Sequence, residues 1–369
     1  MKILIVSSSF YPQNSPRSFR TTELAKEFAR QGHEVTVLTP KNKKVHPEFE
    51  KEHGVTIKDL GGPGWKEVKI KGKGLGKITR RALRRLPMVF FDYPNIEYFF
   101  LVKKKLSNEE GYDLMISIAV PHSIHWGVAA VRTKKHSIAK TWVADCGDPF
   151  MGARQDTFRK LFYFQYFENS FLKKADFVSV PFEDLIKKFN KKYVSKFKTI
   201  PQGFEFENPK NTKPSNSIPT FIYAGTIMPG FRDPFSLIDF LLTINADFRF
   251  FIYTKQQHLF SRYAQIIDKK LFIKDYIPRE QLINQMSLAD FLVNIDVDNT
   301  DGLINAIPSK LIDYYLSGRP VLSYEQSKID FKTVQAFLKG DYSRKLVFKN
   351  MDRYKIEKVS QQFLELINK

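Results

Sequence analysis

Residues 308–322 read PSKLIDYYLSGRPVL, and this segment is the most informative one in the chain. Proline is well tolerated at a helix start, so Ser309 and Lys310 fall in the first turn of a predicted helix. The unpaired N–H groups and the positive dipole end of that turn favour a phosphate. Asp313 follows on the same helix face, where its two oxygens can accept both hydroxyl groups of a ribose. The segment predicts a nucleotide site, although an ordinary capped helix of an α/β domain has the same pattern.

Strand-like and helix-like segments alternate on both sides of this motif. An apolar run at 291–295 precedes it, Gly318 ends its helix and a new strand begins at 319–322. Near the amino terminus, an apolar run at 3–6 leads through a loop and a helix to a second run at 35–38. This alternation predicts an α/β fold with doubly wound parallel sheets, whose ligands bind beyond the carboxyl ends of the strands.

The domain boundaries follow from a composition change at 205–219, which is polar and rich in proline and asparagine. We expect one domain at 1–204 and a second at 205–350. The remaining residues, 351–369, have apolar positions at the spacing of one buried helix face. We expect that helix to pack back on the first domain.

Composition narrows the class of protein. With 369 residues, 43% of them hydrophobic, the chain can form two domains with full cores. Its one cysteine, Cys146, excludes an internal disulfide and agrees with a reducing compartment. No apolar run approaches the roughly 20 residues of a membrane span, and the first six residues form a short strand instead of a signal peptide. The expected location is the cytoplasm.

The net charge of +20 indicates an anionic partner. Residues 66–85 hold nine Lys or Arg and a single acid, Glu67, and aromatic residues follow them. A basic amphipathic helix beside aromatic residues is typical of docking on anionic lipid, so residues 66–105 predict peripheral association with the inner face of a membrane. A solvated lysine-rich helix has the same pattern.

Two other motifs are incomplete. The acidic run at 296–301 imitates the start of a calcium loop, but Asp301 stands where that loop needs glycine and Ile307 where it needs glutamate. The first strand is followed by three serines, at 7–9, instead of the Gly-x-Gly-x-x-Gly of dinucleotide oxidoreductases. We therefore expect no metal site and no bound cofactor.

Taken in order, several short motifs resemble the retaining glycosyltransferases of the fourth family, the type that builds bacterial surface polysaccharides. Each motif is weak by itself, and their order along nearly the whole chain is specific. They are FYP at 10–12 followed by Arg17 and Arg20, GHEVT at 32–36, VPHS at 120–123, AD at 144–145 with DP at 148–149, KAD at 174–176, IPQGF at 200–204, YAGT at 223–226 and the segment 308–322.

The resemblance implies a GT-B fold, in which two Rossmann-like doubly wound domains face a cleft. It implies a carboxy-terminal domain that binds a nucleotide sugar, UDP-linked more often than GDP-linked, and an amino-terminal domain that binds a glycan or a lipid-linked acceptor. The implied activity is a metal-independent, retaining hexosyl transfer in capsule, lipopolysaccharide or exopolysaccharide synthesis.

The resemblance also assigns the donor site residue by residue. Asp313 takes the place of the acid that binds the ribose, usually a glutamate, and Asn305 stands where many members carry a further glutamate. Arg232 and Lys310 are the cations that would stabilise the departing diphosphate. The donor-binding residues are Gly225, Thr226, Lys255, Asn305, Ser309, Lys310, Leu311 and Asp313.

On the acceptor side, the resemblance assigns Arg17, Arg20, His122 and Asp145. His122 follows a strand and opens a helix, where it could orient hydroxyl groups without acting as a base. The residues expected to take part in catalysis are thus His122, Arg232 and Lys310.

Two other functions are compatible with the composition or the fold. One is a non-catalytic basic protein that binds nucleic acid or an anionic membrane; the other is a nucleotide-sugar epimerase. Nucleic-acid binding does not require Ser309, Lys310 and Asp313, so the transferase is preferred and no nucleic-acid partner is expected.

Overall fold

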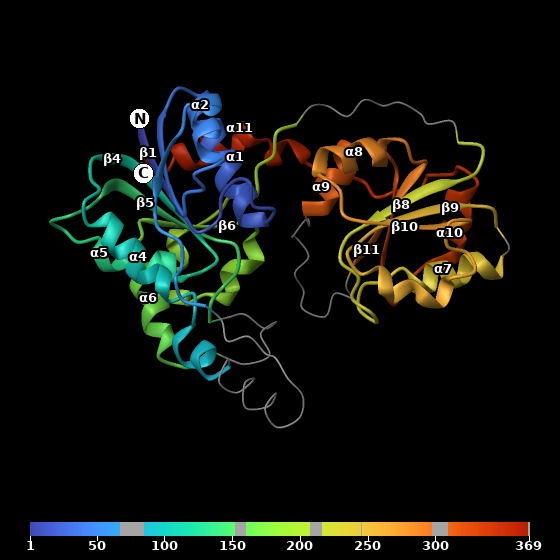
Figure 1. Ribbon diagram of the computed structural model, residues 1–369, viewed down its shortest axis with the longest axis horizontal. Coiled ribbons are helices and arrows are strands. Elements are labelled where there is room, and N and C mark those ends of the chain that lie inside the picture. Colours follow the sequence, from blue (N-terminus) through green and yellow to red (C-terminus); the bar gives the residue numbers. More distant parts are fainter. Residues whose placement is uncertain (67–84, 152–159, 207–215, 245, 297–308, 368–369) are drawn as a thin grey trace. The chain divides into compact units, whose positions relative to one another are not determined.

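The computed structural model describes residues 1–66, 85–151, 160–206, 216–244, 246–296 and 309–367. The chain divides into two compact units. Unit 1 comprises Met1–Glu205 and Asp352–Lys369, and unit 2 comprises Phe206–Met351. Each unit contains one parallel sheet with helices on both faces (Figure 1). The predicted α/β class with two Rossmann-like sheets is confirmed.

Unit 1 is built on a seven-stranded sheet in the order β3-β2-β1-β4-β5-β6-β7. Every neighbouring pair is parallel, and β1 lies between β2 and β4, with Ile3 opposite both Val35 and Leu114. The central strands are buried apolar runs, as expected for a sheet covered on both faces. The strands are β1 (Lys2–Ser7), β2 (Glu34–Thr39), β3 (Thr56–Asp59), β4 (Tyr112–Ala119), β5 (Ala139–Cys146), β6 (Phe177–Val180) and β7 (Phe197–Thr199).

Two cores lie on the two faces of this sheet. One packs against α4, α5 and α6, and the other against α1, α2 and α11. Although α11 comes from the end of the chain, its Ile356, Val359 and Phe363 are buried in the second core. These are the apolar positions whose spacing predicts a buried helix face. The helices are α1 (Pro16–Arg30), α2 (His46–His53), α4 (Glu97–Leu106), α5 (Ser123–Val131), α6 (Phe164–Lys174) and α11 (Ile356–Leu364), with 3-10 turns η1 (Glu183–Lys188), η2 (Lys191–Lys196) and η4 (Met351–Tyr354).

Unit 2 repeats the arrangement with five parallel strands in the order β10-β9-β8-β11-β12. One face is covered by α7 and α10, and the other by α8 and α9. The strands are β8 (Thr220–Ala224), β9 (Arg249–Tyr253), β10 (Leu271–Lys274), β11 (Phe291–Asp296) and β12 (Val321–Glu325). The helices are α7 (Phe235–Thr243), α8 (Arg279–Ser287), α9 (Ser309–Leu316) and α10 (Phe331–Leu338), with the 3-10 turn η3 (Gln257–Tyr263).

The strand order reverses at one point in each sheet, between β1 and β4 in unit 1 and between β8 and β11 in unit 2. In open parallel sheets, ligands bind outside the carboxyl ends of the strands at this switch point. The loops that leave those strand ends include residues 120–122 of unit 1 and residues 225–234 of unit 2. The functional groups of each unit are therefore expected there.

No helix in the described ranges has both the length and the apolar character needed to cross a bilayer.

The interior of unit 1 contains an ion pair between Arg20 of α1 and Asp145 of β5. Both side chains are almost completely buried, and the guanidinium contacts both carboxylate oxygens, at 3.2 and 2.8 Å. Arg20 also donates to the backbone oxygens of Ile200 and Pro201 and lies over the ring of Phe363 of α11. The pair thus ties α1 to β5, to the end of β7 and to α11.

Replacing Arg20 with methionine should destabilise unit 1 by about 3 to 5 kcal/mol, because Asp145 then keeps a buried charge without its main partner. Chemical denaturation of the full chain measures this. The matched control is Lys26→Met on the same helix, whose ion pairs are 3.8 to 3.9 Å long and partly exposed; it should change stability by less than about 0.5 kcal/mol. Equal effects of the two variants would contradict a structural role for Arg20.

Candidate functional site

The loop after β8 begins at a position whose backbone conformation requires glycine. Gly225 has φ +151°, a conformation that residues with a side chain rarely adopt. A Cβ there would meet no atom closer than 3.5 Å, so the backbone, and not a lack of space, demands glycine. The Gly225 N–H donates to the carbonyl of Tyr253, which holds the turn at the end of β9.

Two polar side chains shape the rest of this loop. Asp233, which is buried, accepts from the N–H groups of Gly230 at 2.6 Å and Phe235 at 3.1 Å, and so caps the start of α7. Gln256 bonds both backbone groups of Ile227 at 2.8 Å. Sequence reasoning missed both residues, although an aspartate just before a proline and a helix is a recognisable cap signal.

Arg232 lies on this loop and carries the first candidate cation. Its backbone N–H donates to Met228 at 2.7 Å, so the position of the residue is set by the loop itself. Within the described part of the chain, its side-chain Nε is buried and has no hydrogen-bond partner. A buried donor without a partner is costly unless a ligand supplies an acceptor.

Lys310 of α9 is the second cation, and the charge of Arg232 acts on it. Its Nζ donates to the carbonyl of Ile295 at 3.1 Å and lies over the ring of Tyr223. Burial, and after it the charge of Arg232, lowers the pKa of Lys310; the charge of Asp296 partly offsets both, and the resulting pKa is about 8. A bound anion would relieve both the desolvation and the repulsion between the two cations.

Tyr314 fixes the helix that carries Lys310. Its side chain is completely buried; its hydroxyl donates to the carbonyl of Val293 at 3.0 Å and accepts from the N–H of Ala224 at 3.1 Å. One side chain of α9 therefore binds both strands of the switch point, β8 and β11. Sequence reasoning did not identify Tyr314, because a tyrosine on an apolar helix face is indistinguishable from ordinary core.

Asp313, the predicted ribose-binding residue, forms an ion pair with Arg279 at the start of α8. The Arg279 Nε donates to Asp313 Oδ1 at 2.7 Å, and both side chains are partly exposed. Burial raises the pKa of Asp313, and the Arg279 guanidinium offsets only part of that rise. Arg279 was not predicted from the sequence; its position in the first turn of α8 carries no signal of this pairing.

The other predicted donor residues differ in their surroundings. Thr226 is exposed, and its carbonyl accepts from the Tyr223 hydroxyl at 3.2 Å. Lys255 is exposed, with its Nζ over the ring of Tyr276. Leu311 packs its side chain into the core of unit 2, so its backbone is the part that a donor could contact. Ser309 begins α9, and Asn305 lies outside the described residues.

In unit 1, the two predicted arginines differ in their exposure to solvent. Arg20, which the resemblance assigns to the acceptor side, is instead buried, and its guanidinium bonds Asp145 and the backbone oxygens of Ile200 and Pro201. Arg17 is 21% exposed, and its guanidinium lies 3.8 Å from Asp145. It also rests against the loop after β5, since a Cβ on Gly147 would fall on its guanidinium. Of the two arginines, Arg17 is therefore the one that is partly accessible.

Asp145 shares its carboxylate among several internal partners. Burial opposes its ionisation, but Arg20, Arg17 and the hydroxyl of Ser179 outweigh burial, so the pKa of Asp145 lies below its usual value. The Ser179 hydroxyl donates to it at 2.6 Å. Asp145 therefore positions the two arginines from within the unit instead of presenting an oxygen to an acceptor, contrary to its assignment from the sequence.

His122 opens α5 at the switch point of unit 1 and is buried. Its Nε2 lies 2.9 Å from the carbonyl of Asp148, which makes Nε2 the protonated nitrogen and Nδ1 an acceptor. Burial lowers the pKa of His122 to about 4, so the imidazole is neutral at pH 7. Among the described residues, nothing bonds to Nδ1. The side chain is suited to accept a hydrogen bond from a hydroxyl and poorly suited to take up its proton.

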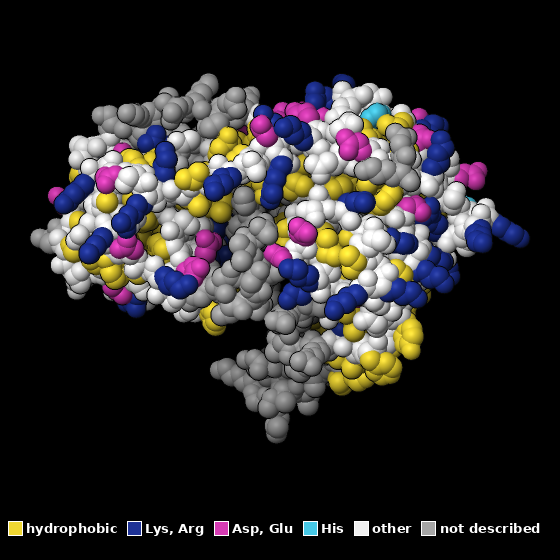
Figure 2. Space-filling model, turned by 180° about the vertical axis from the view of Figure 1, so that it is seen from behind, with side chains coloured by type: hydrophobic (Ala, Val, Ile, Leu, Met, Phe, Trp, Pro, Cys, Tyr) yellow, Lys and Arg dark blue, Asp and Glu magenta, His cyan; other side chains and the backbone are white. Residues whose placement is uncertain are grey.

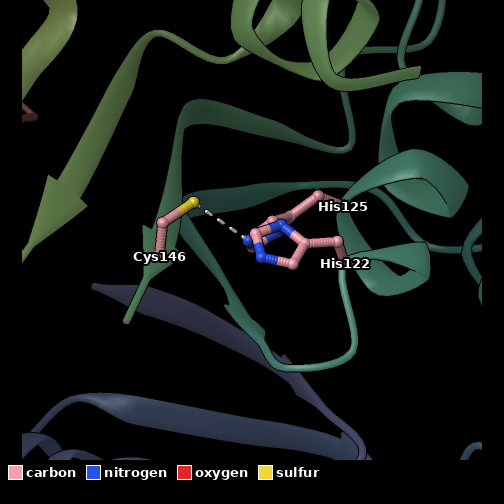
Figure 3. Close-up of side chains that lie close together, drawn as sticks. All are labelled: His122, His125 and Cys146. Carbon is pink, nitrogen blue, oxygen red and sulfur yellow. Dashed lines mark hydrogen bonds between the residues drawn. The ribbon is translucent and has the colours of Figure 1, made fainter. Parts of the chain in front are cut away.

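Behind His122, the ring of His125 points toward Cys146 (Figure 3). The candidate ligand atoms of the three residues lie within 4.8 Å of one another, and two imidazoles with a thiolate suit a soft transition metal. Burial raises the pKa of the Cys146 thiol and lowers the pKa of His125 to about 3, so both groups are neutral. His125 is already bonded to Ser117 at 2.8 Å. This hydrogen-bonded, neutral set supports a packing role, and the absence of a metal site stays a prediction.

The pKa of Lys310 leads to a test of its contact with phosphate. Below pH 8 its ammonium is charged, and above pH 8 the charge is lost. The association constant of UDP should therefore fall above pH 8, by at most about tenfold per pH unit. In Lys310→Arg the cation persists and the fall should largely disappear. Calorimetric titration from about pH 7 to about pH 9.5 measures both proteins.

Lys274→Arg, which changes an exposed lysine of the same unit, should keep the wild-type pH profile. Identical profiles for wild type and Lys310→Arg would remove Lys310 from the phosphate site.

Comparison with known proteins agrees with this architecture. A family model described as a glycosyl transferase 4-like domain matches residues 18–201. No curated protein sequence matches the chain. Among solved structures, the lipopolysaccharide outer core galactosyltransferase WaaB is 12% identical over all of this chain and 99% of its own, with a TM-score of 0.60. TarM is 12% identical over the same shares, with a TM-score of 0.61.

A mutant of S. aureus TarM, solved with UDP, fondaparinux and alpha-GlcNAc-glycerol, is 11% identical over all of both chains, with a TM-score of 0.58. At such low identities these structures show a shared fold alone. That fold is GT-B, which confirms the fold that the resemblance implies. Residues 18–201 thus belong to the glycosyl transferase 4-like domain family, and the chain that contains them is a glycosyltransferase of the GT-B type.

Proposed function

We propose that the chain is a retaining hexosyltransferase whose donor is a nucleotide-diphosphate sugar bound by unit 2. One observation carries the proposal. The loop after β8 carries Arg232, whose buried Nε has no partner among the described residues, and α9 carries Lys310, whose Nζ bonds the Ile295 carbonyl of β11, so both cations lie at the switch point of the second sheet. Asp313 follows Lys310 on the same short helix. Two cations and a carboxylate in this order suit a diphosphate that is joined to a ribose.

UDP is the preferred nucleotide of the donor, with GDP second. Support comes from the TarM mutant, whose structure was solved with UDP. The same structure contains fondaparinux and alpha-GlcNAc-glycerol, and this favours a glycan-like acceptor for the present chain. The description of WaaB as a lipopolysaccharide outer core galactosyltransferase favours a surface polysaccharide, a lipopolysaccharide or a capsule as the product.

The proposed reaction breaks the bond between the anomeric carbon of the sugar and the diphosphate oxygen, and the electron pair leaves with the diphosphate. The acceptor hydroxyl forms the new bond on the same face of the sugar, and its proton passes to an oxygen of the departing phosphate. Arg232 and Lys310 act by stabilising the negative charge that grows on the leaving group. Because these cations carry that task, the proposal needs no metal.

On the acceptor side the proposal gives different roles to the four predicted residues. His122 offers a neutral acceptor nitrogen to a hydroxyl, and Arg17 offers a partly exposed cation. Arg20 and Asp145 hold the loops in place from inside the unit. We include peripheral attachment to the inner face of the cell membrane in the proposal, because a lipid-linked acceptor would be presented there.

A non-catalytic basic protein is the second candidate, favoured by the net charge of +20. Such a protein would bind polyanions through Coulomb attraction alone, and its affinity would fall steeply with salt. It has no need of the Arg279–Asp313 pair or of the fixed loop that carries Arg232. Nucleotide selectivity therefore separates the two functions.

Asp313→Ala should abolish the preference of the protein for a ribose over a 2′-deoxyribose. Wild type should be stabilised by UDP or by GDP, by about 2.7 kcal/mol at one hundred times the dissociation constant, and less by the 2′-deoxy analogue, because the lost hydroxyl leaves Asp313 without its ligand. In Asp313→Ala the two nucleotides should stabilise equally and weakly. Thermal unfolding with UDP, GDP, CDP, ADP and the deoxy analogues measures this.

The control is Asp247→Ala, which removes an exposed carboxylate of the same unit and should bind nucleotide as wild type does. A shift with UDP that Asp313→Ala leaves unchanged would overturn the site assignment. If no nucleotide stabilises wild type, the transferase proposal fails and the polyanion-binding protein is favoured.

A further inference from the structure

The loop after β5 contacts two side chains at the switch point of unit 1. Its Asp148 carbonyl accepts from His122 Nε2 at 2.9 Å, and the preceding residue, Gly147, lies against the Arg17 guanidinium. The three atoms nearest to a Cβ on Gly147 would all belong to that guanidinium. Gly147 has no positive φ, so the arginine, and not the backbone, requires glycine here. Arg17 and His122 thus lie beside consecutive residues of one loop.

The charge of Arg17 is only partly balanced inside the unit. Its Nη1 lies 3.8 Å from Asp145, whose oxygens are closer to Arg20, at 2.8 and 3.2 Å, and to the Ser179 hydroxyl, at 2.6 Å. Two guanidinium groups and one carboxylate leave one net positive charge. Within the described ranges Arg17 forms no other ion pair, and 21% of its side chain is exposed. The surplus charge is therefore on the side chain that solvent reaches.

The other charges near His122 do not cancel this surplus. Burial lowers the pKa of His122, the bond to the Asp148 carbonyl opposes this, and the charges of Arg17 and Lys160 lower it further. Lys160 lies 3.5 Å from the Asp92 carboxylate, which balances its charge. The Asp148 carboxylate belongs to an exposed residue, so water and salt screen it. Arg17 therefore gives this place a positive potential.

His122 adds a second requirement. Its side chain is 3% exposed, and among the described residues nothing bonds its Nδ1, which is an acceptor because Nε2 carries the proton. A nitrogen lone pair repels an anion and attracts a hydroxyl group. A ligand that satisfies both side chains therefore needs a hydroxyl group for His122 and an acidic group for Arg17. The guanidinium fork matches the oxygens of a carboxylate or a phosphate.

The overall charge of the chain does not by itself identify such a ligand. Lys and Arg side chains are scattered over both units on the face shown in Figure 2, with acidic side chains among them. Charge of this kind attracts any polyanion. Arg17 differs, because Gly147 leaves room for its guanidinium and the next residue binds His122. The ligand is thus selected by position as well as by the sign of its charge.

We propose that the acceptor bound by unit 1 is an acidic sugar, with Arg17 on its carboxylate or phosphate group and His122 on one of its hydroxyl groups. Gly147 is then a specificity-determining residue, since any larger side chain would displace the Arg17 guanidinium. The inference rests on the proposed function and deepens it, because a neutral glycan would satisfy that function equally well. Unit 1 binds the sugar without the donor, so the contact is measured in the absence of nucleotide.

The test is calorimetric titration of the full chain with matched sugars at low ionic strength, without nucleotide. The probes are the methyl glycosides of glucuronic acid and galacturonic acid, the 6-phosphates of methyl glucoside and methyl galactoside, and the two neutral methyl glycosides themselves. At least one acidic probe should bind roughly tenfold more tightly than the neutral sugar of the same configuration, because a charge-assisted bond replaces a neutral one. Preference for the uronate or for the phosphate separates the two acidic groups, and added salt should reduce either preference.

Three variants locate the preference on the proposed residues. Arg17→Gln should lose it, Arg17→Lys should keep part of it, and Gly147→Ala should lose it although the arginine is still present. Lys26→Gln, the matched control, removes a partly exposed cation from the same helix and should keep the wild-type ratio. The readout is the ratio of acidic to neutral affinity, which a general loss of stability would not change, and unfolding midpoints check that each variant is folded.

Equal affinity for acidic and neutral sugars in every wild-type pair, or no binding of any acidic probe, would overturn the inference. So would an acid preference that Arg17→Gln and Gly147→Ala leave intact. Titration of the same proteins with UDP separates this inference from the proposed function. Weaker UDP binding by Arg17→Gln would assign Arg17 to the donor phosphates and overturn the inference as well. UDP binding that is intact in wild type and depends on Asp313 would leave the proposed transferase standing in each of these cases.

Discussion

Parallel strand pairing is the constraint on which the rest of the molecule depends. Every neighbouring pair of strands in both sheets is parallel, so each connection must cross a face of the sheet, and both faces become buried. The carboxyl ends of all strands of one sheet then point to the same edge. Where the strand order reverses, two loops diverge and leave backbone and side-chain groups available to a ligand. His122 in unit 1, and Arg232 with Lys310 in unit 2, lie at these points.

Burial decides which charged side chains are structural and which can meet a ligand. Arg17 and Arg20 lie less than one helical turn apart on α1 and both approach Asp145, yet Arg20 is enclosed and Arg17 is partly exposed. In unit 2, burial lowers the pKa of Lys310 and Asp296 offsets this only in part; under the proposed function, a bound diphosphate supplies the remaining counter-charge. Under the proposed function the two units thus use buried charge in opposite ways: unit 1 neutralises it internally, whereas unit 2 leaves it for the donor.

Much of the fold and part of the candidate site could be predicted from the sequence. The alternation of apolar runs and helices predicted both sheets, and the order of short motifs predicted the GT-B fold. Gly225, Lys310 and Asp313 could be found because glycine at a strand end and charge at a helix start leave local signals. Asp233, Gln256, Tyr314 and Arg279 could not be assigned their roles, since each acts on a partner distant in the chain and looks like an ordinary loop, core or helix residue.

The sequence by itself determined the fold class, the family resemblance and the types of residue at the donor helix, because hydrophobic period, capping and motif order are local properties of the chain. Only the tertiary structure decided how the charges are used. It placed Arg20 and Asp145 in a buried ion pair, brought the charge of Arg232 to act on Lys310, and bonded Tyr163 to the carbonyl of Phe90. These outcomes depend on desolvation and on contacts between distant segments. Both arise only when the sheets are packed.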